Sequence, residues 1–147
     1  MRILIFGVAP WVKTAYGKNT RDLMSFLRDF DVDVASYYGH HGTEMRVGSS
    51  RVFPCYESFN ELPEWIEYYV QGTGADMVLQ HFDIWVLPEG WIEEISVPVV
   101  TYAPVDCEPM HYKQAACSRG AVMNVAMSKF AQRAFAQAGM PNVYIPH

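Results

Sequence analysis

Short apolar runs alternate with segments of helical periodicity along the chain. The first run, RILIFG (residues 2–7), is almost continuously apolar, as is typical of a strand buried on both faces in a parallel sheet. A helix is predicted over residues 20–30, and a second strand over residues 32–38. Strand, helix and strand in this order predict a βαβ unit with parallel strands. The apolar stripe of the predicted helix consists of Leu23, Leu27 and Phe30, with Met24 beside it.

The same alternation continues to the end of the chain. Helices are predicted over residues 59–72 with Asn60 as N-cap, and over residues 128–139 with Ser128 as N-cap. We read residues 39–50 as a loop, and Pro54 should push the strand in which it lies toward a sheet edge. The further strands are predicted at 51–56, 75–83, 97–106, 121–127 and 142–145, and shorter helices at 88–95 and 111–120. About seven strands predict a Rossmann-like three-layer α/β/α sandwich, a mostly parallel sheet with helices on both faces, as one domain over residues 1–147.

Composition and charge narrow the class of partner. The chain has 147 residues, of which 50% are hydrophobic, enough to form the core of one domain. Its 16 acidic and 11 basic residues include no Lys/Arg run, so we expect no nucleic acid or anionic membrane as partner. The apolar start lacks the features of a signal peptide. Three cysteines without a CxxC pair then indicate reduced thiols and a cytoplasmic location.

The loop after the first strand lacks the G-x-G-x-x-G fingerprint. Only Gly7 and Gly17 occur there, so a nicotinamide or flavin cofactor is not expected. AYGKN nevertheless opens a helix, whose N-terminal amides favour an anion such as phosphate. Alternatively, Gly17 only lets the loop turn into the helix.

Polar residues follow two later strands. His81 and Asp83 end the strand at 75–83, on the same side of an extended segment. A histidine beside a carboxylate can accept a proton from a hydroxyl, although His81 could equally be a half-buried residue bonded to backbone.

The stretch TYAPVDCEPMHY, residues 101–112, is the richest in polar side chains. Asp106, Glu108 and His111 follow a strand end on a loop that contains two prolines. Carboxylates in fixed directions suit recognition of sugar hydroxyls. Asp106 could alternatively cap the next helix.

Several other kinds of site are not supported by the spacing. The histidines, cysteines and carboxylates lack the short paired spacing of a zinc site, so no metal is expected. A G-x-S-x-G elbow, a P-loop and an H-E-x-x-H motif are all missing from the sequence.

Five stretches together resemble the N-terminal half of GT-B-fold glycosyltransferases, especially the retaining glycosyltransferase family 4. In that family a helix that begins with Ser is followed by the text V.viphGvD, which leads into a second domain; MSKFAQRAFAQAGMPNVYIPH, residues 127–147, is similar to it. The resemblance implies that residues 146 and 147 are exposed or loosely held. The five stretches are MRILIFGVAPW...TAYGKNTRDL, ADMVLQHFDIW, VPVVTYAPVDCEP, VAMSKFAQRAFAQAG and NVYIPH.

The resemblance implies roles for individual residues. The loop near the donor diphosphate matches AYG at Gly17, although Ala15 stands where the family has another glycine. Asp106 resembles the polar residue that faces the reacting sugar, and His81 and Asp83 resemble the family's H.D. We therefore predict Asp106 and His81 as catalytic residues, Tyr16, Gly17 and Lys18 as a donor-phosphate loop, and Trp11, Asp83, Glu108 and His111 on the acceptor side.

The resemblance also implies that the donor and the acceptor are bound mainly by different domains. In these enzymes a C-terminal domain holds the nucleotide-sugar, and its Glu-containing motif has no counterpart here. We expect an acceptor-binding domain, inactive or nearly so alone, whose acceptor is a glycan, a lipid or another small molecule. The alternative is a stand-alone, non-catalytic Rossmann-like binding module whose exposed apolar surface supports a homodimer or a partner protein.

Overall fold

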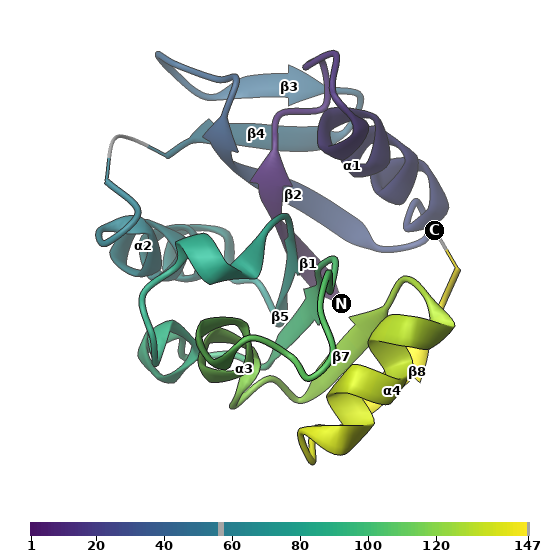
Figure 1. Cartoon of the computed structure of the whole chain (residues 1–147). Helices are drawn as coiled ribbons and strands as arrows, with labels where there is room; N and C mark the ends of the chain where they lie inside the picture. The colour runs from purple at the N-terminus through teal and green to yellow at the C-terminus, as the bar shows by residue number, and fades with distance from the viewer. Residues whose placement is uncertain (56–57, 147) are drawn as a thin grey trace.

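The computed structural model describes residues 1–55 and 58–146, and within them eight strands form one sheet (Figure 1). The strands are β1 (Arg2–Val8), β2 (Asp31–Tyr38), β3 (Met45–Val47), β4 (Ser50–Pro54), β5 (Met77–His81), β6 (Val99–Tyr102), β7 (Met123–Ala126) and β8 (Asn142–Tyr144). Their order is β3-β4-β2-β1-β5-β6-β7-β8, and every neighbouring pair is parallel except β3 with β4. The predicted α/β class with a mostly parallel sheet is confirmed.

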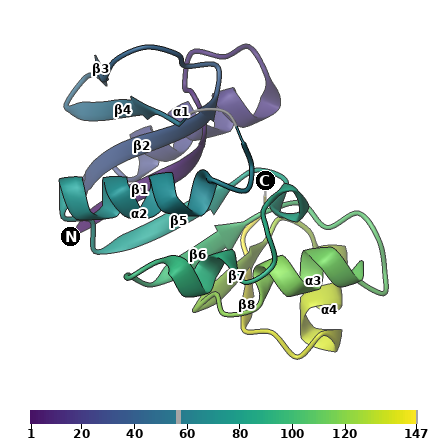
Figure 2. The same cartoon turned by 90° about the vertical axis from the view of Figure 1, so that its left-hand side faces the viewer.

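Helices cover the two faces unequally. Ile3 and Ile5 of β1 pack with one apolar cluster that includes residues of α1, whereas Leu4 and Phe6 pack with the cluster under α2. This division follows from the two-residue period of a strand. Figure 2 shows α1 and α2 on opposite sides of the sheet. The helices are α1 (Ala15–Phe26), α2 (Leu62–Thr73), α3 (Tyr112–Ser118) and α4 (Lys129–Gln137), with short 3-10 helices η1 (Ile84–Val86) and η2 (Trp91–Glu94).

The face that carries α1 is only partly covered. Ala126 of β7 packs against α4, so its neighbour Val125 points to the other face, where it lines a groove of about 540 Å³ beside α1. Helices therefore lie on both faces of the sheet, as predicted, but α1 covers only part of the face on which it lies. The groove is lined mainly by Leu23, Leu27, Leu79, Tyr102, Val125 and Ile145.

One edge of the sheet differs from the prediction. Residues 45–47, predicted as loop, form β3, which pairs antiparallel with β4. β4 is therefore the second strand from the edge and not the edge strand, although β3 pairs only with residues 50–52 and Pro54 lies beyond that pairing. The strand predicted over 51–56 ends at Pro54, and residue 56 lies outside the described residues.

Helix boundaries also differ. α1 begins at Ala15 with Thr14 as N-cap and ends at Phe26, so Phe30 lies beyond the helix and is exposed. The N-cap of α2 is Glu61 rather than Asn60, and it makes no side-chain capping bond. Ser128 caps α4 as predicted, its hydroxyl accepting a hydrogen bond from the amide of Ala131 at 3.0 Å.

The C-terminal stretch agrees with its prediction where it is described. Residues 142–144 form the last strand, Pro146 is exposed, and residue 147 lies outside the described residues. In the described part of the chain, the helices are too short or too polar to cross a bilayer.

Candidate functional site

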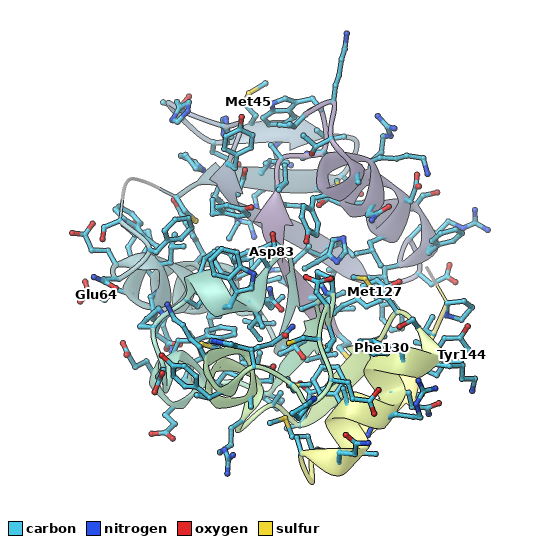
Figure 3. All side chains as sticks on the ribbon, in the orientation of Figure 1. Met45, Glu64, Asp83, Met127, Phe130 and Tyr144 are labelled. Atoms are coloured by element: carbon cyan, nitrogen blue, oxygen red, sulfur yellow. The ribbon has the colours of Figure 1, made fainter. Side chains whose placement is uncertain are left out.

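The candidate site lies at the carboxyl ends of the central strands. The chain moves from β1 to β2 on one side and later returns to β5 on the other, so the strand order reverses between β1 and β5. In open α/β sheets this is the position where ligands bind. Figure 3 shows Asp83 in the middle of the molecule, between the half that carries α1 and the half that carries α3 and α4.

A hydrogen bond joins the start of α1 to the end of β5. The Tyr16 hydroxyl donates to Oδ1 of Asp83 at 2.8 Å, although the two residues are 67 positions apart. Burial, followed by the Asp83 carboxylate and the nearby charges of Tyr37 and Asp106, raises the pKa of Tyr16 well above its usual value. Tyr16 is therefore a neutral hydrogen-bond donor at physiological pH. The second carboxylate oxygen of Asp83, Oδ2, can accept a hydrogen bond from a ligand.

The first turn of α1 is held by two local features. The Thr14 hydroxyl accepts a hydrogen bond from the amide of Gly17 at 3.1 Å. A Cβ atom at Gly17 would lie 2.3 Å from the carbonyl oxygen of Val12, so only glycine permits this close approach. The Gly17 amide predicted to face a donor phosphate is thus already engaged by the helix cap.

His81 lies behind Tyr16. Its side chain is fully buried, and Nδ1 is 2.9 Å from the carbonyl oxygen of Tyr102. A carbonyl only accepts hydrogen bonds, so Nδ1 carries the proton. The imidazole lies edge-on to the Tyr16 ring, with the ring centroids 5.5 Å apart, and stacks on the Tyr102 ring at a centroid distance of 5.0 Å. In this arrangement His81 would reach a substrate only through Tyr16 or after Tyr16 moves.

Tyr37, at the end of β2, completes one wall of the site. The centroid of its ring lies 4.2 Å from that of Phe82 and 6.1 Å from that of Phe59. Burial raises the pKa of Tyr37 to about 12, with further contributions from Asp83 and Tyr38. The sequence analysis did not single out Tyr37 or Phe59; their signal is only an aromatic residue at or beyond a strand end.

The predicted polar residues of the loop after β6 divide into two groups. Asp106 is exposed, and its charge acts on Tyr16. It does not cap the next helix, because Nδ1 of His111 accepts from the amide of Lys113 and fills that role. Oε1 of Glu108 accepts from Gln137 at 2.7 Å, and Oε2 lies 3.8 Å from Arg133. These contacts attach Glu108 and His111 to helices rather than to Tyr16 or Asp83.

The other predicted residues lie around the same loops. Lys18 forms a 3.0 Å ion pair with Asp22 on the exposed side of α1. The indole nitrogen of Trp11 donates to the carbonyl of Gly39 at 2.7 Å, and its ring packs edge-on against buried His40. Among residues 1–55 and 58–146, no three His, Cys, Asp or Glu side chains are grouped so as to hold a metal ion.

The site is acidic. Residues 82–90 and 103–112, which follow β5 and β6, contain no Lys or Arg. Within the described part of the chain, neither Asp83 nor Asp106 lies within 4.0 Å of a basic group. Two carboxylates and a neutral phenol can together orient hydroxyl groups of a ligand.

Sheet order, connections and the position of the site define a Rossmann-like domain of the kind found in GT-B glycosyltransferases. No family model and no curated protein matches the sequence. A sucrose-phosphate synthase structure from Thermosynechococcus elongatus superposes with a TM-score of 0.66 at 12% identity, over 100% of this chain and 89% of that chain. A structure from E. coli, described as trehalose-6-phosphate bound with UDP-2-fluoro glucose, superposes with a TM-score of 0.63 at 8% identity, over 94% of this chain and 42% of that chain. At such identities the likeness shows the fold alone.

Proposed function

We propose that this domain is the acceptor-side half of a glycosyltransferase that uses a nucleotide-sugar donor. The observation that carries the proposal is the hydrogen bond between Tyr16 of α1 and Asp83, at the reversal point of the sheet and within reach of the Asp106 charge. The similarity in fold to two structures, one a sucrose-phosphate synthase and one with bound UDP-2-fluoro glucose, supports the same class.

Asp83 has the leading role in this proposal. Oδ1 is fixed by Tyr16, so Oδ2 is directed and can accept a hydrogen bond from the acceptor hydroxyl that attacks the donor sugar. Tyr16 is a positioning residue, because it acts through Asp83. Asp106, on the opposite loop, would face the reacting sugar, while His81 supports Tyr16 and Tyr102 from below.

The donor would be held mainly by a second domain. In the described residues the Gly17 amide is bonded to Thr14 and Lys18 is paired with Asp22, which leaves few groups for a diphosphate. Transfer requires donor and acceptor to be held together, so we expect this domain alone to bind acceptors with little or no turnover.

Isothermal titration of the chain with saccharides and with nucleotide-sugars tests the proposal. We expect saturable saccharide binding that Asp83→Asn abolishes and that Asp22→Asn, a matched change on the exposed side of α1, leaves unchanged. Nucleotide-sugar binding that is tighter than saccharide binding would place the donor site here and refute the assignment. Saccharide binding without transfer, even when a donor-binding domain is supplied, would instead identify a stand-alone binding module.

A further inference from the structure

Exposed aromatic side chains gather at the same edge of the sheet as the candidate site. One is the last residue of β2, three lie in the segments that follow β1, β4 and β5, and the fifth begins α3, the helix after β6. Large apolar side chains left in water at one end of a sheet mark a binding surface. We call this set the aromatic rim; it consists of Trp11, Tyr38, Phe59, Trp85 and Tyr112.

Part of the aromatic rim is continuous with the acidic site. Phe59 is 45% exposed and contacts Tyr37, on whose phenol the charge of Asp83 acts directly. Trp85 is 49% exposed and lies two residues beyond Asp83, which is the N-cap of η1. Phe59 is thus linked to Asp83 through Tyr37, and Trp85 is close to Asp83 along the chain.

One member of the aromatic rim, Trp11, and its neighbour Tyr37 in the site wall are held by ring contacts and hydrogen bonds. The Trp11 indole is fixed by its hydrogen bond to Gly39 and by the buried ring of His40. Tyr37 is fixed between Phe82 and Phe59. Binding to rings that are already ordered loses little conformational entropy.

The charge of the surface restricts its ligand. Proteins that bind phosphate groups commonly use Arg, which matches phosphate with two parallel hydrogen bonds. Residues 39–44, 82–90 and 103–112 contain no Arg or Lys, and Asp83 and Asp106 would repel an anion. In the loop between β1 and α1 the one basic residue is Lys13, which is exposed. A ligand with hydroxyl groups, apolar ring faces and no charge matches both the carboxylates and the aromatic rings.

We propose that the acceptor is an uncharged sugar, with a ring face on the aromatic rim beside Asp83 and a hydroxyl on Asp83. This inference rests on the proposed function and adds the class of acceptor. The carboxylates of Asp83 and Asp106 disfavour a phosphorylated sugar at this position.

The test compares neutral oligosaccharides with sugar phosphates by titration monitored through tryptophan fluorescence and amide chemical shifts. Maltotriose, cellotriose and chitobiose represent the first class, and glucose 6-phosphate and fructose 6-phosphate the second. We expect binding of at least one neutral sugar, with Trp85→Ala and Phe59→Ala each weakening it by about tenfold, the effect of losing one aromatic contact. Tyr68→Ala, an exposed aromatic on α2, is the matched control and should leave affinity unchanged.

The outcomes separate this inference from the proposed function. Binding of sugar phosphates through Asp83 in preference to neutral sugars would overturn the inference and leave a glycosyltransferase domain with an anionic acceptor. If the aromatic variants change the oligomeric state in size-exclusion chromatography but not sugar binding, the rim is a protein interface and the inference fails. The absence of any saccharide binding would refute both proposals.

Discussion

Replacing Gly17 with alanine tests how the start of α1 is positioned. The added Cβ would lie 2.3 Å from the carbonyl oxygen of Val12 and 3.0 Å from that of Ala9. Both are backbone atoms, so a side-chain rotation cannot relieve the overlap. Either α1 or the loop before it must move, and the hydrogen bond from the Gly17 amide to Thr14 would be strained or lost.

The size of the effect follows from opposing contributions. Overpacking costs about 1–3 kcal/mol and a lost N-cap about 1 kcal/mol, while alanine gains about 1 kcal/mol over glycine in a helix. We therefore expect Gly17→Ala to lower the free energy of unfolding by about 2 kcal/mol. Gly72 in α2 is a matched control, because its Cβ would meet nothing within 4 Å, and Gly72→Ala should stabilise by about 0.5–1 kcal/mol.

Urea unfolding followed by circular dichroism measures both variants. The reasoning is refuted if Gly17→Ala is as stable as the unmodified chain, or gains stability as Gly72→Ala does. Saccharide titration adds a second readout. Because Tyr16 precedes Gly17, displacement of the first turn should also break the bond to Asp83 and weaken binding.

Two further predictions concern charges. Asp33 is largely buried and accepts hydrogen bonds from Nη2 of Arg51 at 2.6 Å and from the Arg51 backbone amide at 2.9 Å. We expect Asp33→Asn to lower the free energy of unfolding by about 2–3 kcal/mol, and Asp22→Asn, in the exposed pair with Lys18, to lower it by at most about 0.5 kcal/mol. Equal losses of the two variants in urea unfolding would contradict this. The raised pKa of Tyr37, about 12, means that the folded state disfavours its phenolate, so this contribution to stability is complete below pH ~10 and is lost as the pH rises toward 12. Spectrophotometric titration should show a late phenolate signal that Tyr37→Phe reduces and Tyr68→Phe does not.

The alternation of strands and helices was predictable because burial leaves a clear periodic signal. Residues 2–7 are apolar throughout since β1 is covered on both faces, and Ser128 is a cap whose side chain is local to its helix. Exposed elements lack that signal. All three residues of β3 are exposed, so its sequence looks like loop, and β4 was predicted one strand nearer to the edge than it is.

The sequence predicts that the polar residues of the candidate site meet at one edge of the sheet, but not which contacts they make there. Loops after parallel strands meet at one edge, so His81, Asp83 and Asp106 were expected there. The hydrogen bond between Tyr16 and Asp83 joins residues 67 positions apart, so no local sequence pattern predicts it. The cap of α3 is similar: both Asp106 and His111 precede the helix, and only the path of the loop decides that His111 makes the capping bond.

The groove beside α1 is a consequence of the handedness of chain crossovers. In a parallel sheet a right-handed connection places its helix on a face set by the direction in which the chain steps. The step from β1 to β2 puts α1 on one face. The step from β2 to β4 runs the same way but carries β3 and no helix, and the steps from β4 through β5 to β8 run the opposite way and add their helices to the other face. No rearrangement of apolar residues within these elements could cover Leu79 and Val125. A covering segment must either run back across the sheet in the direction of the first step or be supplied by another molecule.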